Sequence, residues 1–98
     1  MFAIRFTRGA LGDLKRLRSH DRARVVDEIE QCLAEQPQEP RRNRKELMAL
    51  VPPWEHVPPV WELRVGDYRV FYDVAAEARL VVVRAVRRKG RSTTEEIV

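Results

Sequence analysis

Two alternating runs of residues joined by Gly66-Asp67 constrain the fold of this chain more than any other feature. Residues 61–65 and 68–74 place apolar side chains at every second position, which is typical of strands with one buried face. Gly-Asp between such runs predicts a two-residue hairpin turn. A turn of this length fixes the register. The apolar pairs that follow from it are Val65 with Tyr68, Leu63 with Val70, and Trp61 with Tyr72. We interpret this face as the core side, covered by helices.

The opposite face of the hairpin carries charge. The same register places Arg64 beside Arg69 and Glu62 beside Phe71. Like charges directly opposite each other destabilise a sheet by a few tenths to about 1 kcal/mol. Two interpretations stay open. Glu62 and Asp73 neutralise the arginines in a surface network, or the guanidinium groups converge to bind phosphate, with Phe71 free to stack on a base. We favour the second.

A second turn, over residues 75–79, leads to a third strand over residues 80–86. If Ala76 lies opposite Arg79, the register places Arg84 opposite Phe71, with Arg88 further along the same charged face. Three apolar residues of this strand then join the core side: Val81, Val83 and Ala85.

The N-terminal third of the chain predicts a strand and two helices. Residues 2–6 alternate like a strand, and Thr7 is a suitable cap for the helix that follows. Ser19 and the two residues after it offer a new cap for a second helix, whose single apolar stripe ends near Gln36. Cys32 borders this stripe, where we expect a core thiol.

All six prolines lie between residues 37 and 59, in a segment longer than ordinary connections. Within it, residues 46–51 form one helical turn or lie flat over the core, and the sequence leaves both open. Near the C-terminus, residues 93–96 predict a further short turn. The lone His56 has no second ligand at metal-binding spacing, so we expect no metal site.

Charge and length narrow the functional classes. A chain of 98 residues has room for one core, and no apolar run reaches the roughly 18 residues of a membrane span. One cysteine excludes a disulfide scaffold or a zinc finger and fits the cytoplasm. Arginine provides 16 of the 19 cations. Two basic runs without acids, residues 41–45 and 78–94, favour an anionic partner such as nucleic acid.

The stretch WELRVGDYRVFY at 61–72, with the later run VVVRAVRRK at 81–89, resembles the RelE/ParE superfamily of type II toxin–antitoxin toxins. The resemblance covers nearly the whole chain, and we expect residues 1–98 to form one such domain. It implies a compact α/β (α+β) fold. An N-terminal strand and a helix hairpin pack on one face of a curved, mainly antiparallel four-stranded sheet. The other face is the concave working surface.

RelE-like members are ribosome-dependent endoribonucleases, in which the 2′-hydroxyl of mRNA attacks the adjacent phosphate. The resemblance implies no metal and no cofactor. It assigns Arg69 to the scissile phosphate, Lys89 or Arg91 to the basic C-terminal segment, and Arg64 to a supporting role. Glu46 and Glu62 are candidates for the general base. The expected RNA-binding residues are Arg84, Arg87, Arg88, Arg91 and Phe71.

Two other activities stay open. A ParE-like toxin inhibits DNA gyrase by protein contact, and the absence of a recognisable acid and base favours this alternative, whereas the arginine face favours RNA cleavage. A third alternative is a degenerate toxin that binds RNA or antitoxin without catalysis. All three imply a small antitoxin partner with an acidic or partly disordered segment.

Overall fold

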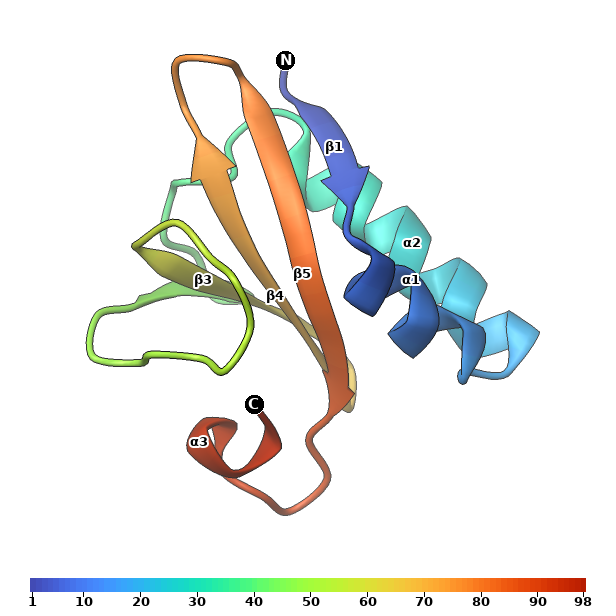
Figure 1. Cartoon of the computed structure of the whole chain (residues 1–98). Coiled ribbons are helices and arrows are strands. Elements are labelled where there is room, and N and C mark those ends of the chain that lie inside the picture. The colour runs from blue at the N-terminus through green and yellow to red at the C-terminus, as the bar shows by residue number, and fades with distance from the viewer.

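The computed structural model describes residues 1–98 and shows one mixed sheet with helices on both sides (Figure 1). Its elements, in chain order, are β1 (Ala3–Phe6), α1 (Arg8–Lys15), α2 (Ser19–Leu33), β2 (Arg44–Leu47), β3 (Val60–Val65), β4 (Tyr68–Ala75), β5 (Leu80–Arg88) and α3 (Thr94–Ile97). The strand order is β1-β5-β4-β3-β2, and only the β1–β5 pair is parallel. The predicted fold class is therefore confirmed, but the sheet has five strands rather than four. None of the helices is long and apolar enough to cross a membrane.

The additional strand is β2, which pairs with β3 and places Leu47 opposite Val60. Residues 46–51 were expected to form a helical turn or lie flat, but the first two of them belong to this strand. The sequence RKEL has no apolar alternation, so its pairing comes from the tertiary structure.

The two long helices cover the predicted core face of the sheet. Thr7 caps α1 as expected, since its Oγ1 accepts from the amide of Ala10 at 3.1 Å. In α2 the apolar stripe is buried at Val25, Ile29 and Leu33. These residues pack with one face of β3, β4 and β5 in a core of 13 buried residues. Cys32 packs against this core, half-buried.

Both ends of α2 differ from the prediction. Ser19 is the first helical residue, and the capping position belongs to Arg18, whose side chain makes no capping hydrogen bond. The helix ends at Leu33, before Gln36. A residue outside the helix caps this end: the buried guanidinium of Arg44 donates hydrogen bonds to the carbonyl groups of Cys32 and Gln36.

The register of the first hairpin is confirmed at every predicted pair, from Val65–Tyr68 to Trp61–Tyr72. The second hairpin follows its prediction only from the turn to the pair Tyr72–Val83. A β-bulge next to Phe71 then shifts the pairing by one residue. Phe71 therefore lies opposite Ala85 and not opposite Arg84.

This shift overturns two further predictions about β5. Ala85 was expected on the core side but lies in a second cluster with Val60 and Phe71, and Val86 takes the core position. Arg88 was expected on the charged face but pairs with Tyr68, whose side chain packs against the core on the helix side. A bulge adds one residue to a strand, so every side chain beyond it changes face.

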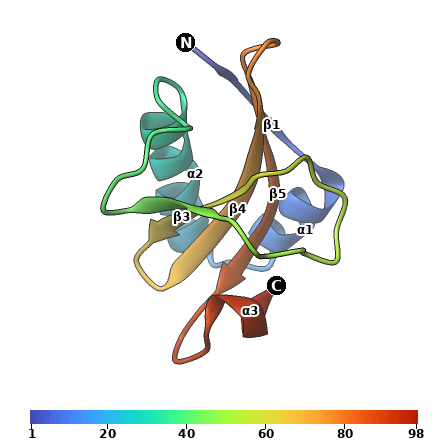
Figure 2. The ribbon, with the colours of Figure 1, turned by 90° about the vertical axis from the view of Figure 1, so that its left-hand side faces the viewer.

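The other face of the sheet is covered rather than open. Figure 2 shows the long β2–β3 connection crossing in front of the sheet, with α3 below it. Leu50 and Trp54 of this connection, and Ile97 and Val98 at the C-terminus, pack against the second apolar cluster. The expected concave working surface is therefore closed by two irregular segments.

Candidate functional site

Three arginines from neighbouring strands form a row across the second face. Arg64 lies opposite Arg69, and Arg69 lies opposite Arg87. The first pair confirms the prediction from the hairpin register. The third member was expected to be Arg84, but the bulge places Arg87 there instead. Arginines on adjacent strands repel each other at this spacing, so stability alone does not favour the arrangement.

Arg84 is neutralised rather than available. Its Nε donates to Asp73 Oδ2 at 2.8 Å, and its Nη2 donates to Oδ1 at 3.2 Å. Asp73, 1% exposed, also accepts from the amide of Val57 at 3.1 Å. The pair therefore fastens the proline-rich connection to the sheet. For Arg84, therefore, the first interpretation of the charged face is correct: Asp73 neutralises the arginine.

Glu62 lies beside Arg69 in the buried part of the face. The two side chains are nearly inaccessible, at 4% and 8% exposure, and Arg69 Nε is 4.0 Å from Glu62 Oε1. Thr94 of α3 donates its hydroxyl to Glu62 Oε2 at 2.7 Å. Arg69 Nη1 donates to the carbonyl groups of Gly66 and Tyr68, whereas its Nε has no partner. A buried donor without a partner is rare in folded proteins, and here it faces a carboxylate beyond hydrogen-bond distance.

The second candidate base, Glu46, is on the wrong side for Arg69. It lies opposite Trp61 in the β2–β3 register, and Trp61 belongs to the core on the helix side. Strand alternation therefore separates Glu46 from Arg69 by the thickness of the sheet.

Phe71 is fully buried, which contradicts its expected position as an open stacking platform. The Trp54 ring packs against it with centroids 5.5 Å apart at an angle of 48°. Trp54 also lies under the Arg87 guanidinium, 5.3 Å from its ring centre. The sequence contains Pro52-Pro53-Trp54 in this connection, but no local pattern identifies the surface that Trp54 contacts.

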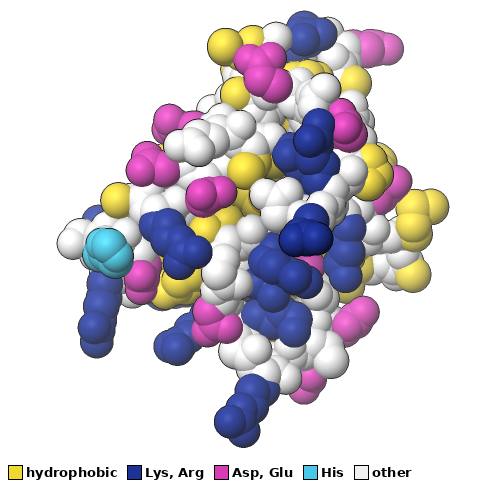
Figure 3. All heavy atoms as spheres, turned by 180° about the vertical axis from the view of Figure 1, so that it is seen from behind, with side chains coloured by type: hydrophobic (Ala, Val, Ile, Leu, Met, Phe, Trp, Pro, Cys, Tyr) yellow, Lys and Arg dark blue, Asp and Glu magenta, His cyan; other side chains and the backbone are white.

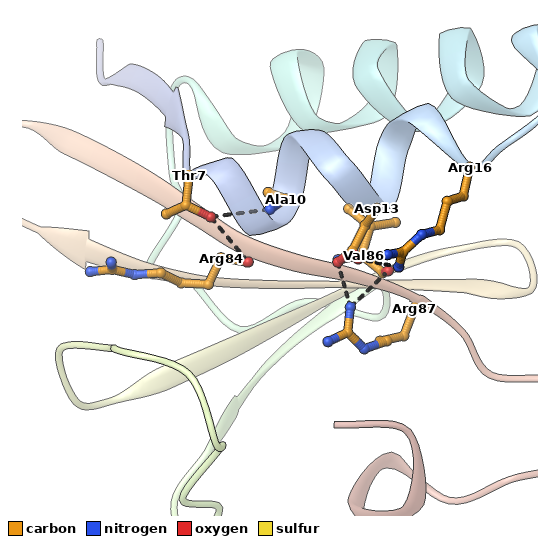
Figure 4. Close-up of polar contacts among 7 residues, drawn as sticks. All are labelled: Thr7, Ala10, Asp13, Arg16, Arg84, Val86 and Arg87. Carbon is orange, nitrogen blue, oxygen red and sulfur yellow. Dashed lines mark hydrogen bonds and ion pairs between the residues drawn. The ribbon is translucent and has the colours of Figure 1, made fainter.

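Arg87 is held at the edge of the sheet by α1 (Figure 4). Asp13 accepts from the amide of Val86 at 2.9 Å and from the Arg87 guanidinium. Thr7 in turn donates to the Arg84 carbonyl at 3.2 Å. Beyond the end of β1, Thr7 and α1 therefore supply hydrogen-bond partners along β5, and Asp13 positions Arg87.

The remaining basic residues lie at the end of β5 and beyond it. Arg88 forms an ion pair with Asp67 at 2.9 Å. This hydrogen bond is the main reason why the pKa of Asp67 is lowered from its ordinary value. Lys89 and Arg91 follow β5, and their side chains make no hydrogen bond or ion pair; Arg91 is exposed and Lys89 half-buried.

The basic run of residues 41–45 lies beside two charged residues of β3, Glu62 and Arg64. A small cavity of about 60 Å³ lies between the start of β2 and the end of β3. Its lining residues are Arg41, Arg42, Asn43, Arg44, Lys45, Glu62 and Arg64. The view from behind Figure 1 shows a dense group of Lys and Arg side chains (Figure 3). Glu62 is the only carboxylate that lines this cavity, so the potential there favours an anion.

Comparison with known proteins shows the family to which the chain belongs. A family model described as the ParE toxin of type II toxin–antitoxin systems matches residues 4–92. The chain belongs to this toxin family. The predicted kinship with the RelE/ParE superfamily is thereby confirmed.

Solved structures of RelE toxins share the toxin's fold. The archaeal RelE–RelB complex from Pyrococcus horikoshii matches with a TM-score of 0.70 and 18% identity, over 93% of this chain and 98% of that chain. The RelBE2 toxin–antitoxin complex from Mycobacterium tuberculosis has a TM-score of 0.70 and 27% identity, over 89% and 96%. The isolated E. coli RelE toxin has a TM-score of 0.62 and 20% identity, over 98% and 93%. No curated protein matches the toxin's sequence.

Proposed function

We propose that this toxin inhibits translation by cleaving mRNA on the ribosome, with Glu62 and Arg69 as its reacting pair. The observation that carries the proposal is the arginine row of Arg64, Arg69 and Arg87 beside the buried carboxylate of Glu62. Such a row costs stability and is suited to a row of phosphates.

The reaction needs a base, a cation and an acid. The 2′-hydroxyl oxygen attacks the adjacent phosphorus, and the bond from phosphorus to the 5′-oxygen breaks. Glu62 takes the 2′-hydroxyl proton, while Arg69, 4.0 Å away, stabilises the negative charge that develops on the phosphate oxygens. Lys89 is our candidate to protonate the leaving 5′-oxygen, and Arg64 and Arg91 bind the flanking phosphates.

RNA reaches this pair only when α3 moves. The helix has four residues, none of them buried, and its polar attachment to the sheet is the Thr94–Glu62 hydrogen bond. Elements with so few contacts open at low cost in free energy. Movement of α3 would release Glu62 Oε2 from Thr94 and expose it to a bound 2′-hydroxyl.

The test is cleavage of ribosome-bound mRNA by the wild-type toxin and by Glu62→Gln. The amide keeps the size of the side chain and an acceptor for Thr94 but cannot take a proton. We expect cleavage to fall by about 10²- to 10⁴-fold, as for loss of a general base. Arg8→Ala, an exposed arginine at the start of α1, is the matched control and should cleave normally. Undiminished cleavage by Glu62→Gln would overturn the assignment.

Inhibition of DNA gyrase by protein contact is the second candidate. It is favoured by the closed second face, because Phe71 and Glu62 are covered, and by exposed apolar side chains beside β2 at Met48 and Val51. A supercoiling assay run beside the cleavage assay separates the two activities. A toxin that is inactive in both and still binds antitoxin would be the degenerate module.

We also propose that the toxin binds a small antitoxin with an acidic, largely unstructured segment. The RelE structures cited above include complexes with RelB antitoxins, and the basic second face suits an acidic partner. Co-purification with the product of a neighbouring short reading frame tests this. An action on ribosomes places the toxin in the cytoplasm.

A further inference from the structure

A cavity of about 600 Å³ lies on the helix side of the sheet, away from Glu62 and Arg69. It is formed between the end of α1, the start of α2 and the β3–β4 turn. Its charged wall residues are Arg16, Arg18, Asp21, Arg24, Asp67 and Arg88. This volume is within the range of small-molecule sites in proteins. No step of the proposed cleavage uses it.

Positive charge dominates the cavity. Asp67 is already paired with Arg88, and that pairing keeps its pKa below the ordinary value. Asp21 accepts the hydroxyl hydrogen of Tyr68 at 3.0 Å. The guanidinium groups of Arg18 and Arg24 make no hydrogen bond or ion pair. Two guanidinium groups are therefore free to bind an anion in the cavity.

The guanidinium of Arg24 lies against the glycine of the β3–β4 turn. A Cβ atom on Gly66 would lie 2.9 Å from Arg24 Nη1 and 3.2 Å from Cζ, so the guanidinium lies directly against the turn. Gly66 also has a φ of 56°, in the left-handed region that favours glycine. The hairpin turn therefore both bends the chain and leaves room for a cation at the cavity wall.

We propose that this cavity binds a phosphorylated nucleoside, with Arg18 and Arg24 as the ligands of its phosphate groups. All four cations of the wall are arginines, whose planar fork matches the oxygens of a phosphate. Leu17 and Tyr68 supply the apolar part of the wall that a base contacts. Burial is the main cause of a raised Tyr68 pKa, so its hydroxyl stays protonated and bonded to Asp21.

The nucleoside can be a free nucleotide or one residue of an RNA strand, since both present the same phosphate and base. Calorimetric titrations with ADP, with a 5′-phosphorylated RNA hexamer and with adenosine distinguish these sources. Tighter binding of ADP than of the hexamer identifies a free nucleotide. The reverse order identifies RNA as the occupant of this cavity when Arg18→Ala/Arg24→Ala weakens the binding of the hexamer. Adenosine lacks the phosphates and should bind at least tenfold more weakly than either.

The double variant Arg18→Ala/Arg24→Ala tests the site itself. We expect at least tenfold weaker binding of the preferred phosphorylated probe, because each charge-assisted hydrogen bond is worth about a factor of ten or more. Arg8→Ala removes an exposed arginine outside the cavity and should bind like the wild type. Thermal unfolding of each variant checks the fold, and Arg18→Lys/Arg24→Lys, which retains charge without the fork, replaces a double variant that fails to fold.

Three results would overturn the proposal: no binding of either phosphorylated probe, equal affinity for adenosine and ADP, or unchanged affinity in the double variant. These results are independent of mRNA cleavage. A toxin that cleaves normally with an empty cavity would refute this site alone, and one that binds ADP without cleaving would refute only the proposed function.

Discussion

The two faces of the sheet are built on different principles. The helix side is a continuous core of 13 buried residues, all of them hydrophobic. The second face has a buried apolar cluster of three residues, and beside it lie three of the four buried charged residues, Glu62, Arg69 and Asp73. The first face is covered by regular helices and the second by a proline-rich connection and a four-residue helix.

This difference indicates which face contributes most of the stability, and it is the second face to which we assign the proposed chemistry. Burial of apolar surface contributes about 25 cal/mol per Å², whereas buried charges contribute little net stability and are costly when left unpaired. A protein can change the second face without unfolding only if the first face carries most of the free energy of folding. Similar substitutions on the two faces of the sheet test whether the helix side contributes most of the free energy of folding.

The largest expected effect is on the helix side. Trp61 is 3% exposed and stacks on Tyr72, with ring centres 6.2 Å apart. Trp61→Ala should lower the free energy of unfolding by about 3–5 kcal/mol, the usual cost of deleting a buried large aromatic side chain. Urea denaturation followed by circular dichroism measures it.

Trp54→Ala is the matched change on the second face. Trp54 is only half-buried, and we expect a loss of about 1–2 kcal/mol. Equal losses for the two tryptophans would show that the proline-rich connection is as much a part of the folding core as the helices.

The next effect is on activity. Arg69→Ala should abolish growth inhibition in cells, because loss of one group that stabilises a transition-state charge lowers a rate by about 10²- to 10³-fold. The fold should persist, since Arg69 belongs to neither apolar cluster. Growth curves with induced expression, together with far-ultraviolet circular dichroism, measure both properties. Full toxicity of a folded Arg69→Ala variant would remove the arginine row from the mechanism.

How far the sequence predicted the structure also differs between the faces. The core side follows from local rules: the Gly66-Asp67 turn fixes the β3–β4 register, and Thr7 caps α1 as its position predicts. These features depend on residues close in the chain, so periodicity and turn chemistry suffice.

The second face depends on contacts between distant segments. The alternating residues of β5 do not indicate the bulge beside Phe71. The bulge nevertheless places Arg87, and not Arg84, next to Arg69 in the arginine row. Its cover comes from Trp54 and from the α3 end, which lie 17 and more residues from Phe71 in the chain. The prediction of clustered arginines was therefore right for Arg64 and Arg69, and it named the wrong residue on β5.

A further substitution tests how the proline-rich connection is attached to the sheet. Asp73→Asn removes the charge that faces Arg84 and keeps an oxygen for the Val57 amide. Breaking a fully buried ion pair costs about 3–5 kcal/mol; because Arg84 is 15% exposed, we expect about 1–3 kcal/mol. A double-mutant cycle with Arg84→Met measures the coupling. If the two losses simply add, the pair does not hold the cover in place.

The smallest effect concerns α3, the other part of the cover. The pKa of Glu96 is lowered, chiefly because its carboxylate accepts a hydrogen bond from the backbone amide of Thr93 at 2.8 Å. A carboxyl group whose pKa is lower in the folded state stabilises that state above its ordinary pKa, here 4.5. This contribution is lost as the pH falls through the lower, folded value. Below pH 4.5 the protection factors of the α3 amides, which compare each exchange rate with the intrinsic rate at the same pH, should therefore fall, while those of β4 stay unchanged. Hydrogen exchange followed by NMR measures this, and Glu96→Gln should show the lower protection factors in α3 already at neutral pH. An equal fall in α3 and β4 would mean that acid loosens both faces together, and that the cover does not open on its own.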